Sequence, residues 1–439
     1  MNRGKIIAIM LLFTVLLAGC SVRTAEDMYA PPKRSEDYNN LQSAIDKAME
    51  GMEYCAPLAG DHQQTVQMAD LNGDGDHEFL LFAKGSEDRP LRILIFHNMN
   101  GNYILADTIE SNGTAFEQVE YVQMDGTGGV EIVVGCQIND QVLRAVNVYT
   151  FSDGQAEQLL SSNYTRFLTV DMDNNGCSEL FILRPGLTDA DNGVAEFFGI
   201  TKGVVERSNE VSMSRPSDKL KRVISGKLYG GQSAVYAASA VGESEIVTDV
   251  YAVNDGRLTN VTFSNESGTS MQTVRNYYVY ANDIDNDGVV ELPDLISMAQ
   301  INELGHMEKQ ELIRWYAMKA SGEEVEKVYT YHNFISGWYL QLESRWAPIL
   351  SVQYSGNSYE FSLWDEAQNS TEKIFTVFLL TGQNREEQSI KDGRFVLYKT
   401  DAVIYAAALE SSAAELGITP EDLIERFHLI QQEWKTGET

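Results

Sequence analysis

Three acidic nonapeptides, each followed directly by an apolar run, constrain this chain more than any other feature. They are Asp70-Leu71-Asn72-Gly73-Asp74-Gly75-Asp76-His77-Glu78, Asp171-Met172-Asp173-Asn174-Asn175-Gly176-Cys177-Ser178-Glu179 and Asp283-Ile284-Asp285-Asn286-Asp287-Gly288-Val289-Val290-Glu291. Each has oxygen-bearing side chains at positions one, three, five and nine, and a glycine at position six, where the chain must reverse sharply. Such a loop can surround a hard divalent cation the size of Ca²⁺. The three nonapeptides are therefore candidate cation sites.

The nonapeptides belong to a longer repeat. Their first residues are 101 and 112 positions apart, which is two periods of about 50 to 56 residues in each case. We therefore expect intervening copies near residues 125 and 228. The segment 124–134 keeps the first acid, Asp125, together with the turn glycines and the apolar strand, but it is too short to keep the ligand set. The segment 228–236 keeps only the glycines and the strand, so both copies are expected to fold without a metal.

Hairpins alternate with these loops. Apolar segments lead into short turns at Asn100-Gly101, Asp153-Gly154, Lys202-Gly203 and Asp255-Gly256, and a stretched fifth copy has Ser321-Gly322. Short glycine turns between apolar segments are typical of β-hairpins. One unit is then a loop, two strands and a hairpin, or about four strands in fifty residues, the size of a β-propeller blade. Each blade buries its apolar faces only against its neighbours.

The combination of loop, following strand and period resembles the FG-GAP/VCBS family of propellers, the architecture of the integrin α-subunit head. It covers about residues 57–333 and implies a mainly β fold: a propeller of about five to seven four-stranded blades with structural Ca²⁺ at about three sites. It places fifteen residues at the metal ions: Asp70, Asn72, Asp74, Asp76, Glu78, Asp171, Asp173, Asn175, Cys177, Glu179, Asp283, Asp285, Asp287, Val289 and Glu291. In this assignment Asp76, Cys177 and Val289 contribute backbone carbonyls. Glutamate replaces the family's commoner aspartate at position nine.

The loops allow two other interpretations. An EF-hand requires glutamate at position twelve and flanking helices, whereas Leu81, Ile182 and Asp294 stand there and β-rich segments follow. Alternatively, aspartate and asparagine side chains cap their own backbone and bind nothing. Carboxylates crowded into nine residues would then repel one another without a cation, so calcium binding is favoured.

The first twenty residues resemble the signal peptide of bacterial lipoproteins. Arg3 and Lys5 precede the apolar run 6–17, which ends in Leu-Ala-Gly-Cys20-Ser. The resemblance implies that Cys20 becomes the lipidated first residue of the mature chain, held in the cell membrane on its extracytoplasmic face. The polar segment 21–37 is predicted to be a tether. An ordinary signal peptide with an incidental cysteine is the alternative.

Charge and cysteine content exclude some functions. With 33 basic and 64 acidic residues the formal charge is −31, which disfavours nucleic-acid binding. The six histidines form no HExxH pattern, so a zinc enzyme has no support. Cys55, Cys136 and Cys177 are interpreted as small buried hydrophobic residues, with one disulfide still possible.

The chain divides into a propeller with an N-terminal helix at 38–333, the helix itself spanning about 38–52, and a small α+β domain at 334–439. Within the latter, Thr419-Pro420 marks a helix start, with Leu423, Phe427 and Ile430 on its apolar face. The aromatic residues of this region are Trp338, Tyr339, Trp346 and Trp364. They are assigned to the core rather than to a sugar- or peptide-binding platform.

Two functions remain. The first is a lipid-anchored, non-catalytic binding module at the cell surface, whose partner is an unknown surface protein or glycan; a structural role in envelope assembly or sporulation cannot be separated from it by sequence. The second is a hydrolase or lyase acting on polysaccharide, because fold does not fix function. No GxSxG, Cys/His or phosphate-loop signature occurs, and no catalytic residue is assigned.

Overall fold

The computed structural model describes residues 36–99, 102–138, 143–188, 191–276, 279–298, 310–347, 349–365 and 370–431. These residues are mainly β and form six sheets of four or five antiparallel strands. The predicted signal peptide with Cys20, the tether up to residue 35 and the Asn100-Gly101 turn lie outside them. Among the described helices, none has the length and hydropathy to cross a bilayer.

The first four sheets follow the chain in order. The first contains β1 (Glu53–Tyr54), β2 (Val66–Ala69), β3 (Glu78–Lys84), β4 (Leu91–Met99) and β5 (Asn102–Ser111). The second contains β6 (Ala115–Val122), β7 (Glu131–Gln137), β8 (Arg144–Ser152) and β9 (Gln155–Asn163). The third contains β10 (Arg166–Val170), β11 (Glu179–Arg184), β12 (Val194–Thr201), β13 (Val204–Arg207) and β14 (Val211–Ser212). The fourth contains β15 (Leu220–Lys227), β16 (Ser233–Val241), β17 (Glu245–Asn254) and β18 (Arg257–Asn260).

The last two sheets are less regular. The fifth has the order β19 (Glu291–Met298), β20 (Gln310–Met318), β21 (Glu324–Asn333), β22 (Trp338–Leu342) and β28 (Phe427–Leu429). The sixth has the order β23 (Leu350–Ser355), β24 (Ser358–Asp365), β25 (Ser370–Leu380), β27 (Ile404–Leu409) and β26 (Phe395–Lys399). The predicted domain boundary after residue 333 therefore falls inside the fifth sheet, between the paired strands β21 and β22.

Consecutive sheets stack face to face, so their central strands are buried on both faces. In β7, Ile132 and Val134 pack toward the first sheet, whereas Val133 packs toward the third. In β11, Ile182 packs toward the second sheet and Phe181 toward the fourth. This double burial explains why each apolar run is continuous rather than alternating. Each sheet thus depends on its neighbours for its core.

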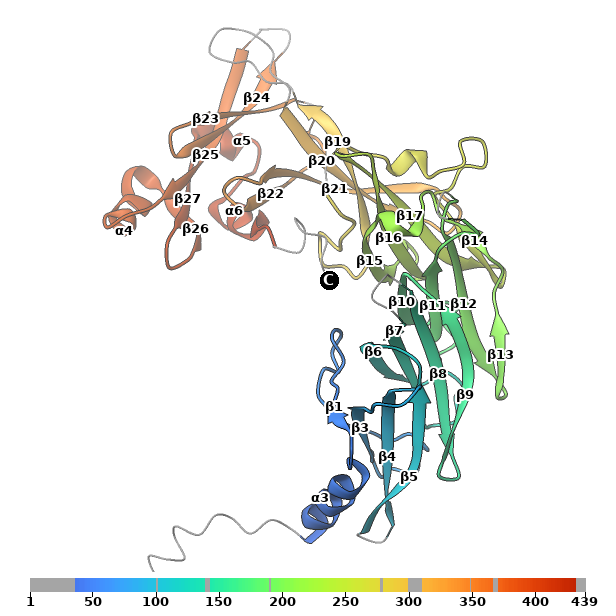
Figure 1. The fold of residues 1–439 in the computed structure, drawn as a ribbon. Helices are drawn as coiled ribbons and strands as arrows, with labels where there is room; N and C mark the ends of the chain where they lie inside the picture. The colour runs from blue at the N-terminus through green and yellow to red at the C-terminus, as the bar shows by residue number, and fades with distance from the viewer. Residues whose placement is uncertain are drawn as a thin grey trace, which may run out of the picture.

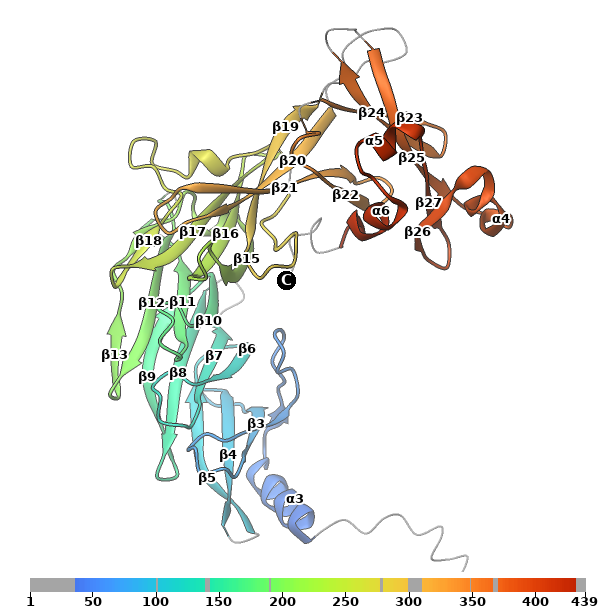
Figure 2. The ribbon, with the colours of Figure 1, turned by 180° about the vertical axis from the view of Figure 1, so that it is seen from behind.

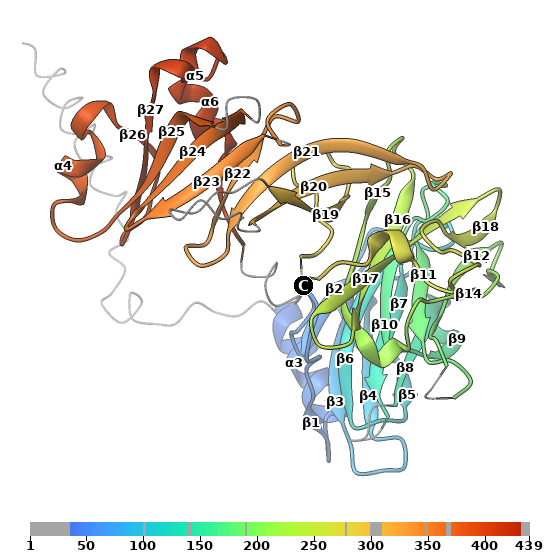
Figure 3. The same cartoon turned by 90° about the horizontal axis from the view of Figure 1, so that it is seen from above.

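The six sheets form a curved row. Figures 1 and 2 show it running from β3–β5 at one end to β23–β27 at the other, with the first strands β6, β10 and β15 along its concave side. Seen from above, β23–β27 lie to one side of the stacked sheets, beside α4 (Arg385–Ser389), α5 (Ser411–Glu415) and α6 (Pro420–Arg426) (Figure 3). Within the described residues, no strand of the first sheet pairs with one of the last. Closure into a ring of five to seven blades stays a prediction.

The predicted N-terminal helix is α3 (Glu36–Ala48). Leu41 and Ile45 are buried against Leu81, Leu94 and Phe96 of the first sheet. This spacing of four residues puts the two aliphatic side chains on one helix face. The helix thus covers the outer face of the first sheet, as Figure 1 shows.

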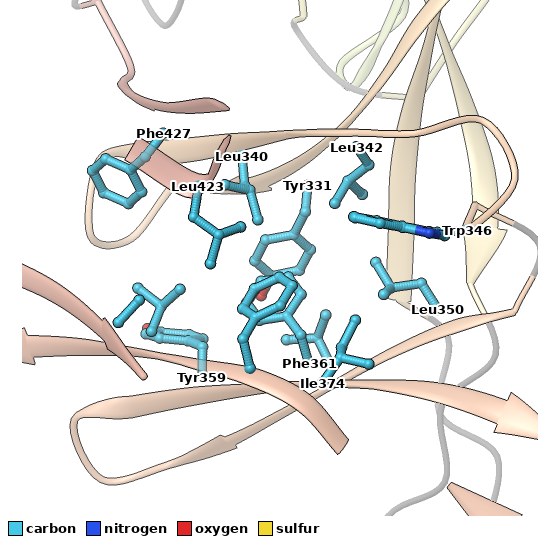
Figure 4. Close-up of a cluster of buried hydrophobic side chains, with 14 of the residues drawn as sticks. Tyr331, Leu340, Leu342, Trp346, Leu350, Tyr359, Phe361, Ile374, Leu423 and Phe427 are labelled. Atoms are coloured by element: carbon cyan, nitrogen blue, oxygen red, sulfur yellow. The ribbon is translucent and has the colours of Figure 1, made fainter. Parts of the chain in front are cut away.

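The C-terminal helix differs from its prediction. Thr419 caps α6 and Asp422 completes the capping box, but the helix ends at Arg426. Phe427 is the first residue of β28 and lies opposite Leu340 of β22. Phe427, predicted on the apolar face of the helix, is therefore in a strand. Pairing with β22 buries Phe427 in the core that the fifth and sixth sheets share (Figure 4).

The same core contains Trp338 and Trp346, whereas Tyr339 packs on the other face of β22 with Ile313 and Trp315. Trp338, Tyr339 and Trp346 are 0%, 5% and 2% exposed, and Trp364 is half-buried. Trp338 stacks on Phe427 with ring centroids 5.4 Å apart. Three of the four aromatic residues are thus core residues, as predicted.

Candidate metal centres and a neighbouring groove

Each intact acidic loop ends in a buried glutamate at the first residue of a strand, β3, β11 or β19. Glu78, Glu179 and Glu291 are 0%, 4% and 0% exposed. In every case the carboxylate accepts a hydrogen bond from the backbone N–H of the loop's second residue, at 2.9, 2.7 and 3.1 Å respectively. The ninth residue therefore links the end of the loop to its start and places carboxylate oxygen inside the loop.

The first aspartate holds the other side of the loop. Asp70 accepts hydrogen bonds from the N–H groups of Gly73 and Gly75 at 2.8 and 3.0 Å. Asp171 and Asp283 accept corresponding bonds, each including one from the glycine at position six. That glycine has a positive φ of 85 to 92° in all three loops, a conformation that a residue with a Cβ adopts only with strain. The loop geometry is thus encoded locally.

Three clusters in the described residues could hold a metal ion, with one ligand atom per residue lying within 4.8 Å of the others. Two are formed by predicted residues: Asp171, Asp173 and Glu179; and Asp283, Asp285 and Glu291. The first loop differs, because its cluster consists of Asp74, Glu78 and His97. Asp70 belongs to the same loop but not to this cluster.

His97 was missed by the sequence analysis. It lies on β4, and its Nδ1 is 2.8 Å from Oε1 of Glu78. Nothing in the local sequence indicates this role, because the pairing of β3 with β4, with Phe79 opposite Phe96, is what brings the ring to the loop. Cross-strand register is the only signal that could have identified it.

The fifth and seventh positions are linked by a turn. Oδ1 of Asp74, Asn175 and Asp287 accepts the N–H of the seventh residue at 2.8, 2.7 and 2.9 Å. The seventh residues are Asp76, Cys177 and Val289, and the expected role of their carbonyls as ligands stays a prediction.

Electrostatics in these loops favours a bound cation. Burial raises the pKa of Glu179 to about 7 and that of Glu291 to about 8, and the neighbouring aspartates contribute in the same direction. Among the described residues, Oε1 of Glu291 is buried without a hydrogen-bond partner. Buried carboxylate oxygen is costly unless it is paired, and a divalent cation would supply that pairing.

The third loop already has a neighbouring cation. Lys327 on β21 places its Nζ 3.5 Å from Asp285 and in contact with Asp287. The hydrogen bond from Lys327 lowers the pKa of Asp287. Lys327 pairs with the outer carboxylates of the loop, whereas Glu291 stays buried beneath them.

The copy near residue 125 corrects the sequence alignment. It is a full nonapeptide, 123–131, in which Gln123 takes the first position and accepts N–H bonds from Asp125 and Gly126. Asp125 is therefore its third residue rather than its first. Glu131 is 2% exposed and accepts the N–H of Met124 at 2.9 Å. The copy keeps the architecture but has lost the acids at positions one and five, and aligning its glutamate with the other three would have shown this.

A groove of about 1030 Å³ lies beside the loops 70–78 and 123–131. Its acidic side chains are Asp74, Asp125, Glu131, Asp153 and Glu157. Part of its wall is apolar and solvent-exposed: Met99, Ile104 and Leu105 are 53%, 44% and 43% exposed. This volume is that of a small-molecule or oligomer site.

Comparisons with known proteins leave the family open. No family model matches the sequence, and no curated protein matches it. Similar solved structures include the exotype rhamnogalacturonan lyase YesX, at 14% identity over 73% of this chain and 67% of that chain, with a TM-score of 0.28. They also include the Aleuria aurantia lectin AAL, at 10% identity over 71% of this chain and 91% of that chain (TM-score 0.26), and the Dos1 propeller, at 10% identity over 81% of both chains (TM-score 0.27). At such TM-scores these similarities decide neither the fold nor the function.

Proposed function

We propose that this protein is a calcium-stabilised, propeller-type binding module, held by a lipid anchor on the extracytoplasmic face of the cell membrane. The stacked sheets are the scaffold, and calcium in the three acidic loops fixes the starts of β3, β11 and β19 in the first, third and fifth sheets. The proposed partner is a surface protein or a glycan. Cys20 is the proposed site of lipidation, on the evidence of the sequence that surrounds it.

The observation that carries the metal proposal is a buried ninth glutamate that lies beside the aspartates at positions one and three. Four loops share its position and its hydrogen bond to the second residue's N–H. Where the aspartates at positions one and three are kept, Glu179 and Glu291 lie within reach of them. Oxygen-only sets of this kind suit Ca²⁺, whereas His97 gives the first loop a nitrogen ligand as well.

Thermal unfolding in calcium and in chelator tests this proposal. If calcium binds only the folded chain, at one hundred times its Kd each site adds about 2.7 kcal/mol to the free energy of unfolding. Asp173→Asn and Asp285→Asn each remove one third-position carboxylate while keeping an acceptor, as Asn72 does in the first loop. A tenfold weaker site should reduce the calcium-dependent stabilisation by about 1.4 kcal/mol.

The matched control is Asp125→Asn, the same substitution at the same position of the loop 123–131, which lacks acids at positions one and five. It should leave the calcium-dependent shift in Tm unchanged. Equal melting of the wild-type protein in calcium and in chelator would exclude calcium stabilisation.

A second candidate function is cleavage of a polysaccharide in the groove. The observation that favours it is Glu131, which lines the groove and whose pKa burial raises to about 7. A carboxyl group that is protonated near neutral pH can act as a general acid. Asp125, Asp153 and Glu157 line the same groove and are candidates for a second carboxylate.

Release of new chain ends from a panel of neutral and acidic polysaccharides distinguishes the two functions. An enzyme should lose at least about 100-fold in rate with Glu131→Gln, whereas Glu131→Gln should leave the binding of a partner elsewhere on the surface intact. Absence of cleavage by the wild-type protein across the panel would favour the binding module.

A further inference from the structure

A second cavity, of about 450 Å³, is basic although the chain is strongly acidic. Four cationic side chains line it, Arg144, Arg166, Lys221 and Arg222, against one carboxylate, Glu117. The whole chain carries a formal charge of −31. Such a local reversal of sign attracts anions to this place against the field of the rest of the molecule.

Three successive sheets build this cavity. Glu117 lies on β6, Arg166 begins β10, and Lys221 and Arg222 lie on β15. Figures 1 and 2 both show these first strands on the concave side of the arc. The cavity therefore lies at the first strands of three sheets, and Ala59, Gly60 and Tyr164 from connecting segments complete its lining.

The one carboxylate of the cavity, that of Glu117, is already paired within the protein. Oε2 of Glu117 is 2.9 Å from Nε of Arg144 and accepts a hydrogen bond from the Tyr164 hydroxyl at 3.3 Å. Arg144 and Arg166 each donate to the same acceptor, the carbonyl oxygen of Thr165, at 3.4 and 3.1 Å. Two guanidinium groups thus converge on one neutral oxygen.

Two other cations of the cavity, Arg166 and Lys221, are available to a ligand. In the described residues neither Arg166 nor Lys221 forms an ion pair with a carboxylate, and both side chains are exposed. Guanidinium groups bind carboxylate and phosphate through paired N–H donors, and lysine adds a mobile charge. The cavity volume lies within the range of small-ligand sites.

We propose that this cavity binds an oxyanion, a carboxylate or a phosphate carried by a small ligand or by the end of a chain. Arg166 and Lys221 are the residues that bind it, and Arg144, held by Glu117, completes the donor set. The inference deepens the proposed binding role and rests on it, because it gives the ligand class of one surface of the module.

Ligand-observed NMR titration of the full chain, in a constant calcium buffer, tests the inference with three probes that share one sugar ring: glucose, glucuronate and glucose 6-phosphate. Binding of an anionic probe without binding of glucose is the expected result. Glucuronate identifies the ligand group as a carboxylate, and glucose 6-phosphate identifies it as a phosphate. Binding of none of the three, or equal binding of all three, would overturn the proposal.

Substitutions locate the binding. Arg166→Gln and Lys221→Gln should each weaken the binding of the anionic probe about tenfold, because each removes one charged donor that the fold does not use in an ion pair. Arg257→Gln on β18 and Lys47→Gln on α3 are matched controls, because both positions are exposed and lie outside the cavity. Equal affinity in variants and controls would contradict the site.

The calcium response separates this inference from the proposed scaffold. The Arg166 and Lys221 variants should keep the calcium-dependent shift in Tm. A calcium shift without anion binding would reject the cavity alone, and anion binding without a calcium shift would reject the calcium scaffold alone.

Discussion

At the scale of single residues, the glutamate at position nine is the most informative side chain. It is buried in four loops and makes the same backbone hydrogen bond in each. Its surroundings differ from loop to loop: Nδ1 of His97 lies 2.8 Å from Glu78, whereas Glu131 forms no ion pair with any residue that the structure describes. The residue therefore has a structural role that outlasts the loss of the metal-ligand pattern.

Glu131 gives a prediction for pH. Burial raises its pKa from 4.5 to about 7 in the folded protein, so the folded state holds the proton more tightly than the unfolded state does. Its contribution to stability is fully present below about pH 4.5 and is lost as the pH rises through about 7. Glu131→Gln keeps an acceptor for the Met124 N–H and removes the titration. Between pH 5 and pH 8 the wild-type protein should lose about 1 kcal/mol relative to this variant, less than the full shift implies because the groove is open to water.

Urea unfolding of the two proteins at both pH values measures this difference, and the other titrating groups cancel in the comparison. A constant difference between pH 5 and pH 8 would mean that Glu131 is charged in the folded state throughout.

At the scale of elements, the hairpin turns follow their sequence. Asp153-Gly154, Lys202-Gly203 and Asp255-Gly256 connect β8 to β9, β12 to β13 and β17 to β18, with φ values of 52 and 76°, 53 and 76°, and 49 and 72°. Two consecutive positive φ values define the type I′ turn, which matches the twist of the strands. Lysine is the poorest of the three residues for this conformation.

Lys202→Asn should therefore raise the free energy of unfolding by about 0.5–1 kcal/mol, because asparagine adopts positive φ more readily than lysine. Chemical denaturation measures the change. Asp255→Asn, at the equivalent position of the next hairpin, is the control and should change stability little. A destabilised Lys202→Asn variant would show that the lysine makes contacts that outweigh its backbone strain.

The sequence predicted elements well where their signals are local. Acidic loops, glycine turns and the Thr419 cap are encoded within a few residues, and so were identified with their strands. His97, the register of the loop at Gln123 and the return of Phe427 to the fifth sheet depend on pairing between distant strands. The position of His97 beside the first loop and the pairing of β21 with β22 across residue 333 therefore could not be predicted from local pattern.

At the scale of the whole molecule, the loops connect neighbouring sheets. The N–H of Ser178 donates to the carbonyl of Gln123 at 2.8 Å, and that of Val290 donates to the carbonyl of Lys227 at 3.0 Å. A Cβ at Gly129 would lie 2.3 Å from the Leu71 carbonyl oxygen. The backbones of the loops 70–78 and 123–131 are therefore in direct contact. Ordering of one loop therefore also orders the loop that it contacts. Calcium bound in one loop should stabilise the neighbouring sheets as well as its own.

Calcium in the acidic loops is the central claim, and a crystal structure grown in calcium tests it most directly through anomalous scattering. The account predicts peaks in the loops 70–78, 171–179 and 283–291, each about 2.3–2.6 Å from carboxylate oxygens, and none in the loop 123–131. Density for water alone in all three acidic loops, at a calcium concentration that saturates known weak sites, would contradict it.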